Sequence, residues 1–153
     1  MSITVARANI ADIQQLIEWR MEVLHEVFGI PVEDNLPKLR EENLAYYQKA
    51  LTDESHIAVF VENDGEIIGC GGACLYQEMP SPDNLMGRCA YLMNIYARKE
   101  YRSMGVGTSI VKELLTLIEE KGISKVYLET SEMAKKLYQE LGFEDMKDYM
   151  ILK

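Results

Sequence analysis

Apolar side chains recur every three or four residues in two segments near the start of the chain. Between residues 9 and 28 the recurring positions are Ile10, Ile13, Leu16, Ile17, Met21, Leu24 and Phe28. Their spacing predicts an amphipathic helix, which follows a short strand, "ITVARA". A second helix is expected to begin near Pro37 and to end at "TDES", since "GIPVEDNLP" breaks the first one.

Extended segments dominate the middle of the chain. The runs "HIAVFVE" and "EIIGCGGACLYQ" are joined by Asn63-Asp64-Gly65, a strong signal for a tight hairpin. They therefore predict an antiparallel pair of strands. The loop "MPSPDNLMG" separates this hairpin from another predicted strand, "RCAYLMNIYAR".

Helical and extended patterns alternate in the remainder of the chain. Ile110, Val111, Leu114, Leu115, Leu117 and Ile118 mark a helix with one apolar face, which ends at Lys121-Gly122. The segments "ISKVYLET" and "DYMILK" are expected to be strands, and "SEMAKKLYQEL" a short helix that stops at Gly142. This order predicts an α+β fold with one mixed sheet between two layers of helices. Because no linker or repeat divides the chain, residues 1–153 are expected to form a single domain.

Composition narrows the function classes. A chain of 153 residues with 48% hydrophobic content can bury one sizeable core. We find no signal sequence or membrane span, and the three cysteines, an odd number without zinc-ligand spacing, are expected to be reduced thiols. A soluble, cytoplasmic protein without a metal site is therefore expected. The net charge of −9 argues against a nucleic-acid partner, whose phosphates require a basic surface.

The stretch "YRSMGVGTSI", residues 101–110, joins a strand to a helix and is the first candidate for chemistry. Such a junction leaves several main-chain N–H groups unpaired at the positive end of the helix dipole, an arrangement that attracts phosphate. Gly105 and Gly107 lack a β-carbon, so an anion can approach the main chain, and Arg102 adds a cation at the rim. The alternative is a plain turn in which the glycines only ease the bend.

A dinucleotide-binding fold is another alternative for the same stretch. Gly105 and Gly107 open a helix, and Glu129 ends the next strand about twenty residues later. However, Ile110 stands where that fingerprint requires a third glycine. The 24 residues after Glu129 are also too few for the remaining strands of such a sheet.

A second motif favours a different phosphate-binding family. Arg102-Ser103-Met104-Gly105-Val106-Gly107 has the order of glutamine or arginine, two residues, glycine, one residue, and glycine or alanine. Downstream, "AKKLYQELGF" (residues 134–143) supplies an alanine, a leucine-tyrosine pair and a glycine-phenylalanine pair at the matching distance. Together these motifs resemble the core of the GNAT superfamily of acetyl-CoA-dependent N-acyltransferases, over about a third of the chain from Tyr91 to Phe143.

The resemblance implies a site for acetyl-CoA as a co-substrate. The residues that would hold its pyrophosphate are Arg102, Ser103, Met104, Gly105, Val106, Gly107 and Thr108. The strand at Ile95, Tyr96 and Ala97 would pair with the pantetheine arm where the sheet splays open at its middle strand, and the N–H of Ile95 would stabilise the oxyanion. Tyr138 would protonate the departing thiolate, and Ala134 and Ser131 would complete the cofactor site.

The chain departs from the family pattern in two places. Ser131 stands where relatives often carry asparagine, and its side chain has a shorter reach to the pantetheine. No carboxylate lies among residues 91–94, where some members place a glutamate base. Since an alkyl amine is neutral in only about one molecule in 2,500 at pH 7, its proton needs an acceptor. The candidates are water relayed through Asn94 or backbone carbonyls, and a carboxylate such as Glu129.

The expected function is transfer of an acetyl group from acetyl-CoA to a primary amine of a small molecule or peptide, by direct attack on the thioester. The amine is expected between the first two helices, their loop and residues 79–87. There Glu22, Glu26, Glu33 and Asp34 either attract a cation or form a solvated face, and Trp19 and Arg20 are equally ambiguous. The alternative is a GNAT-like module that binds acyl-CoA or a partner without catalysis. Relatives with this fold are often homodimers, although no residue fixes the oligomeric state.

Overall fold

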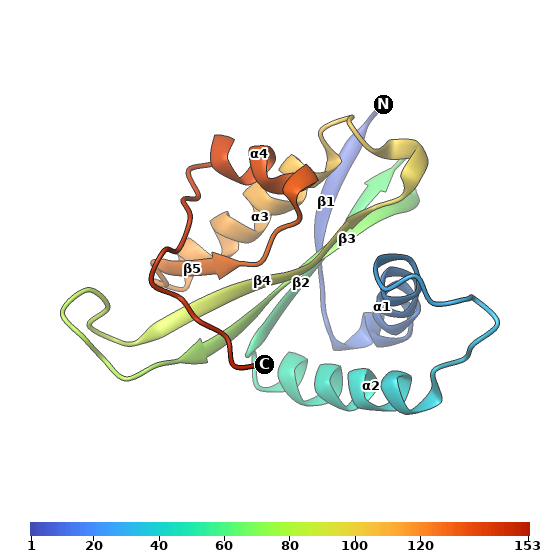
Figure 1. The fold of residues 1–153 in the computed structure, drawn as a ribbon. Helices are drawn as coiled ribbons and strands as arrows, with labels where there is room; N and C mark the ends of the chain where they lie inside the picture. Colours follow the sequence, from blue (N-terminus) through green and yellow to red (C-terminus); the bar gives the residue numbers. More distant parts are fainter.

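A five-stranded mixed sheet organises the chain (Figure 1). The computed structural model describes residues 1–153. Its strands, side by side in chain order, are β1 (Ile3–Ala8), β2 (His56–Asn63), β3 (Glu66–Gln77), β4 (Arg88–Ala97) and β5 (Lys125–Leu128). The first four pair antiparallel and β5 lies parallel to β4, so both the predicted mixed sheet and the predicted antiparallel hairpin are confirmed.

Helices cover both faces of this sheet (Figure 1). The helices α1 (Ile13–Val27) and α2 (Pro37–Thr52) lie on one face, and α3 (Val106–Glu120) and α4 (Glu132–Glu140) lie on the other. Short 3₁₀ turns, Ile10–Asp12 and Lys99–Tyr101, precede α1 and α3. The first helix therefore begins later than its apolar pattern predicts, because the Asn9 side chain caps the 3₁₀ turn by accepting from the N–H of Ala11.

The strand β2 is apolar at nearly every position because both of its faces are buried. Ile57 and Val59 belong to the core that contains Ile110 of α3. Phe60, with the opposite orientation, packs in a second core beside Trp19 of α1, with ring centroids 6.3 Å apart. The period-two alternation of a strand thus divides one apolar run between two cores, one on each side of the sheet.

The sheet opens between β4 and β5. Pairing between these two strands is limited to four residues on each, Cys89–Leu92 and 125–128. Just beyond, β4 contains a bulge, since Cys70 pairs with Tyr96 while Gly72 pairs with Met93, so that two residues of β4 lie opposite one of β3. At this bulge Asn94 adopts a left-handed backbone conformation, with φ of 62°. The edge of β4 after Leu92 therefore has no neighbouring strand on the side of β5.

The prediction of a final strand at "DYMILK" is wrong. No residue after α4 belongs to a strand, and the side chains of Met150 and Leu152 are 94% and 98% exposed. The tail instead places the ring of Tyr149 against that of Tyr127, 6.0 Å between centroids. The segment has the composition of a strand, but no strand pairs with it, because β5 pairs with β4 alone. None of the helices combines the length and the apolar character needed to cross a membrane.

Candidate active site

Six consecutive main-chain N–H groups lack an acceptor at the junction between β4 and α3. On either side of them, the N–H of Arg102 donates to the carbonyl of Lys99, and the N–H of Ser109 donates to the carbonyl of Gly105. The amides of residues 103–108 between them form no hydrogen bond with the protein. Ser103 and Gly105 adopt left-handed conformations, with φ of 66° and 82°, which bend the chain so that α3 begins directly after Gly105. Unpaired amides at a helix N-terminus form a site suited to a phosphate group.

Five of these six residues, Ser103 and 105–108, line an open groove of about 720 Å³ between the edge of β4, the start of α3 and α4. Most of the residues predicted for the cofactor site lie there: Ile95, Tyr96, Ala97, Arg102, Ser103, Gly105, Val106, Gly107, Thr108, Ala134 and Tyr138. Met104 and Ser131 do not line the groove. Met104 is 54% exposed, and the Ser131 hydroxyl caps α4 by accepting from the N–H of Ala134 at 3.3 Å.

Sequence reasoning missed four lining residues, Tyr101, Lys136, Leu137 and Glu140. A signal for three of them was available, because Lys136, Leu137 and Glu140 fall inside the "AKKLYQELGF" motif on a helix. Side chains three or four residues apart share a face of a helix, so Leu137 lies on the same face as Ala134, and Lys136 shares a face with Glu140.

Arg102 does not direct its guanidinium group at the unpaired amides. Its Nε donates to the carbonyl of Ala97 at 2.8 Å and its Nη2 donates to Glu26 Oε2 at 2.6 Å. The guanidinium carbon lies 5.5 Å from the centre of the Tyr96 ring. Through these hydrogen bonds, Arg102 holds the turn before α3 against β4 and α1.

The carboxylates of α1 that were candidates for a cation site are already paired. Glu22 accepts a bidentate pair of hydrogen bonds from Arg98 at 3.2 and 3.0 Å and a further one from the Tyr96 hydroxyl at 3.0 Å. Glu26 pairs with Arg102. These two side chains therefore hold α1 against β4, which favours the structural interpretation over recognition of a cationic amine.

Tyr138 lies at the inner end of the groove. Only 8% of the residue is exposed, and its ring packs nearly perpendicular to that of Phe143 at 5.7 Å. Burial raises the pKa of the phenol above its ordinary value, which keeps the group protonated at neutral pH. The hydroxyl has no hydrogen-bond partner within the protein and is not sealed from solvent, so it is free to donate to a bound molecule.

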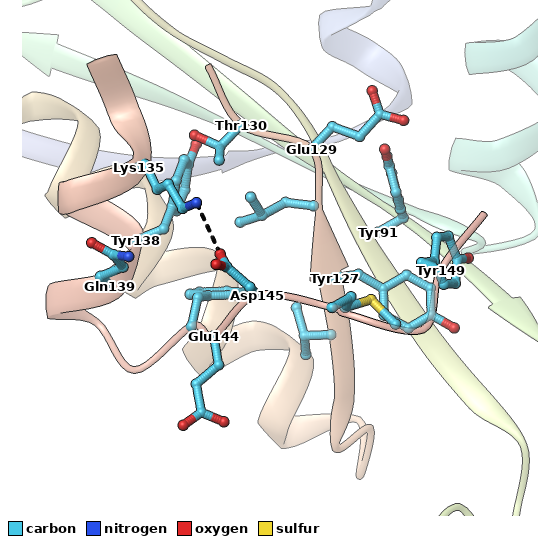
Figure 2. Close-up of a pocket in the computed structure, with 14 residues that line it drawn as sticks. Tyr91, Tyr127, Glu129, Thr130, Lys135, Tyr138, Gln139, Glu144, Asp145 and Tyr149 are labelled. Atoms are coloured by element: carbon cyan, nitrogen blue, oxygen red, sulfur yellow. Dashed lines mark ion pairs between the residues drawn. The ribbon is translucent and has the colours of Figure 1, made fainter. Parts of the chain in front are cut away.

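A cavity of about 280 Å³ adjoins Tyr138 on the side of β5 and the tail (Figure 2). Glu129, the first residue after β5, lines it, and Figure 2 shows its carboxylate beside the hydroxyl of Tyr91. Burial, together with the charge of Glu129, raises the pKa of Tyr91 to about 12. On the far side of the cavity, Lys135 pairs with Asp145 at 3.1 Å.

A family model for acetyltransferases of the GNAT family matches residues 13–143. Among curated proteins, the thialysine N-epsilon-acetyltransferase of Bos taurus is 35% identical over 65 residues, which are 40% of this chain and 38% of that protein. The matched region is thus well under half the length of this curated relative.

Solved structures show the same fold across nearly the whole chain. A predicted acetyltransferase of Clostridium acetobutylicum, crystallised with acetyl-CoA, has a TM-score of 0.87 at 23% identity and covers 99% of this chain and 96% of its own. A GCN5-related N-acetyltransferase of Ralstonia eutropha has a TM-score of 0.82 at 19% identity, with 99% of both chains covered. With a family match that extends over most of its residues, the chain belongs to the GNAT family of acetyltransferases.

Proposed function

We propose that this chain is an acyl-CoA-dependent N-acyltransferase that moves an acetyl group from acetyl-CoA to a primary amine of a small molecule or peptide. The observation that carries the proposal is the row of six unpaired amides, 103–108, which belong, except for that of Met104, to residues of a groove that also contains Tyr138 and the open edge of β4. Family membership supports the reaction class.

Each part of the groove has a role in this proposal. The amides of residues 103–108 bind the pyrophosphate of the co-substrate. The open edge of β4 binds its amide-rich arm as one strand binds another, and the N–H of Ile95 stabilises the negative charge that develops on the thioester oxygen. Tyr138 donates its proton to the departing sulfur, a role supported by its free hydroxyl.

We propose Glu129 as the acceptor of the amine's proton. The amide oxygen of Asn94, an alternative relay, already accepts from Nη1 of Arg20 at 3.0 Å. Glu129 follows β5 at the point where β4 and β5 separate, and its side chain is exposed. Because side chains alternate along a strand, Glu129 lies on the same face of the sheet as Tyr127 and Tyr91, away from α3.

Direct attack of the amine on the thioester is supported by the positions of the cysteines. Cys70 and Cys89 are buried, and Cys74 lies in contact with Tyr46. None of the three lines the groove that contains Tyr138, which favours direct attack over an acetyl-thiol intermediate. All three are free, and we place the protein in the cytoplasm, where thiols stay reduced.

The test is release of coenzyme A thiol from acetyl-CoA in the presence of amino acids, polyamines, aminoglycosides and peptides. We expect turnover with at least one of these amines and a fall in kcat of roughly a hundredfold in Tyr138→Phe, which keeps the ring packing but removes the acidic proton. Unchanged kcat in Tyr138→Phe would contradict the role of the phenol. If acetyl-CoA binds but no amine on the panel is acetylated, the chain is a binding module rather than an enzyme.

A further inference from the structure

A small pocket of about 190 Å³ adjoins the β4 bulge on the face of the sheet covered by α1 and α2. Its walls come from five elements, through Arg20, Asn43, Tyr46, His56, Met93 and Asn94 among others. Asn94 and Met93 belong to this pocket, whereas Ile95, the next residue, lines the groove proposed for acetyl-CoA. The two spaces lie on opposite faces of the sheet and are bordered by consecutive residues of the bulge, where the proposed function requires the amine to reach the thioester.

Arg20 is the unusual member of this pocket because no carboxylate pairs with it. Its Nε donates to Asn43 Oδ1 and its Nη1 donates to Asn94 Oδ1, each at 3.0 Å. Since a guanidinium group has five N–H donors, three remain available in a fixed, planar arrangement.

The other arginines around α1 are all paired. Arg40, Arg98 and Arg102 form ion pairs with Glu18, Glu22 and Glu26, so every glutamate of this helix already has a partner. The two asparagines hold Arg20 in position without neutralising its charge, which leaves its remaining donors to an external anion.

The rest of the pocket adds no opposing charge. Its lining contains no aspartate or glutamate. Burial and the charge of Arg20 lower the pKa of His56 to about 4, so the imidazole is neutral at pH 7, and it bonds the Tyr46 hydroxyl at 2.8 Å. Arg20 is thus the one charged group of the pocket at neutral pH, and the pocket favours an anion over a second cation.

We infer that the acetyl acceptor carries a carboxylate, which Arg20 binds while the acceptor's amine reaches the bulge at Ile95. This inference rests on the proposed function and names its substrate class. Asn94 connects the two positions, because its side chain contacts Arg20 and its main chain adjoins Ile95. One asparagine side chain and about 3.8 Å of backbone separate them, so the amine must lie several bonds from the carboxylate. The acceptor class is therefore an amino acid that reacts through its side-chain amine, rather than a polyamine or an aminoglycoside.

The reaction itself is the same for such an acceptor. The side-chain nitrogen forms a bond with the acetyl carbon, and the carbon–sulfur bond of the thioester breaks. The ammonium nitrogen loses one proton to Glu129 before it attacks. It loses a second proton after the new bond forms, and this proton returns to Tyr138, which has given its own proton to the departing sulfur. The carboxylate stays on Arg20 and takes no part in bond making.

The experiment compares lysine with cadaverine, which differ only in the carboxylate, and ornithine with putrescine as a shorter pair. Thiol release from acetyl-CoA gives kcat/KM for each amine. We expect the wild type to prefer the carboxylate-bearing member by roughly 10- to 100-fold, the effect of one charge-assisted interaction, and Arg20→Gln to abolish most of that preference. Arg20→Lys, which keeps the charge, should retain part of it. Arg7→Gln, at an exposed position on β1, is the matched control and should leave the preference intact.

Several outcomes would overturn the inference. A kcat/KM of the wild type for cadaverine equal to or above that for lysine would refute the inference but not the proposed function. Turnover of any amine would still support the proposed function. If Arg20→Gln lowers kcat/KM by the same factor for both members of a pair, Arg20 supports the structure of the bulge and does not bind the carboxylate. Preference for an aminoalkyl phosphate over the carboxylate of equal length would assign the pocket to a different anion. If no amine releases thiol, the proposed function fails and the inference fails with it.

Discussion

Gly105 is held in a backbone conformation that favours glycine, and the unpaired amides depend on it. Its φ is 82°, and a β-carbon added there would meet no atom within 4 Å. A larger residue at this position is therefore limited by backbone conformation and not by space. The residue controls the direction in which the neighbouring N–H groups point.

We expect Gly105→Val to weaken acetyl-CoA binding by about tenfold or more, because strain of roughly 1–3 kcal/mol would turn the amides away from the phosphates. Isothermal titration calorimetry measures this loss. Gly122→Val is the matched control, since Gly122 has φ of 75° and equally open surroundings but follows the opposite end of α3. Gly122→Val should lose a similar amount of stability but keep its affinity for acetyl-CoA. An equal loss of acetyl-CoA affinity in both variants would contradict a role for residues 103–108.

Glu129 is the residue on which proton removal from the amine depends in our proposal. Glu129→Gln keeps the size and polarity of the side chain but cannot accept a proton at neutral pH. We expect kcat/KM for the amine to fall by roughly a hundredfold at pH 7, while acetyl-CoA binding is unchanged. The deficit should shrink at alkaline pH, where more of the amine is already neutral. If Glu129→Gln lowers kcat/KM only slightly and by the same factor at every pH, water or backbone carbonyls accept the amine's proton instead.

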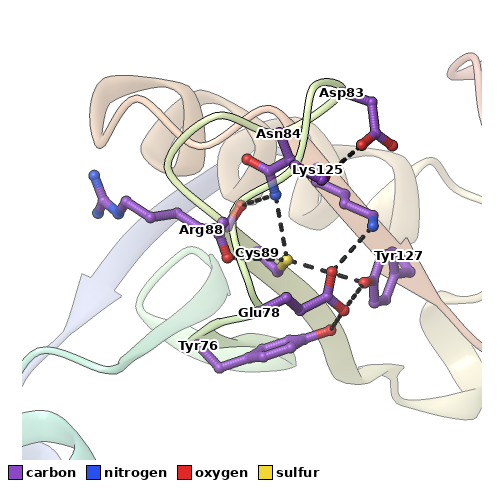
Figure 3. Close-up of polar contacts among 10 residues, drawn as sticks. Tyr76, Glu78, Asp83, Asn84, Arg88, Cys89, Lys125 and Tyr127 are labelled. Atoms are coloured by element: carbon purple, nitrogen blue, oxygen red, sulfur yellow. Dashed lines mark hydrogen bonds and ion pairs between the residues drawn. The ribbon is translucent and has the colours of Figure 1, made fainter.

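At the scale of elements, Glu78 fastens the loop between β3 and β4 to β5 (Figure 3). Its carboxylate accepts from the hydroxyl of Tyr127, from Lys125 Nζ at 3.0 Å and, more weakly, from the Tyr76 hydroxyl at 3.4 Å. The bonds from Tyr127 and Lys125 lower the pKa of Glu78 from 4.5 to about 2. This network holds the short strand β5 in place.

A lowered pKa means that Glu78 stabilises the fold above pH 4.5, and that this contribution is lost as the pH falls towards 2. We therefore expect Glu78→Gln to have a lower Tm than the wild type at pH 7. The difference between the two should narrow as the pH falls from 4.5 to 2. Thermal unfolding followed by circular dichroism measures this, with Glu62→Gln on β2 as a control carboxylate outside the network. A constant difference across the pH range would show that the ionised carboxylate is not responsible.

Local chemistry predicted most elements but not the bulge that shapes the site. The hairpin between β2 and β3 follows from Asn63-Asp64-Gly65, which is a signal contained in three residues. The sequence around the bulge at Asn94 contains no glycine that would predict it. Asparagine is nevertheless among the residues that tolerate a left-handed conformation, so its presence within an apolar strand was a usable signal.

At the scale of the whole molecule, the features that escaped prediction depend on contacts between distant parts of the chain. Arg102 was expected to face the phosphate, but its partner Glu26 lies 76 residues away and no local pattern indicates the pair. The segment "DYMILK" has the composition of a strand, yet a strand also needs a neighbouring edge, and β5 supplies no ladder to it. Many of the groove residues were predictable because two short motifs contain them, whereas the pocket around Arg20 is assembled from five separate elements.

Under the proposed function, the chain transfers an acetyl group from the sulfur of coenzyme A to the nitrogen of an amine. The most direct measurement is nuclear magnetic resonance of the protein incubated with carbonyl-13C acetyl-CoA and lysine. We expect the thioester signal to be replaced by an amide signal, with one free thiol of coenzyme A for each amide formed, and we expect Tyr138→Phe to slow this conversion. A thioester that persists with every amine tested, or thiol release without an amide, would contradict the proposed function.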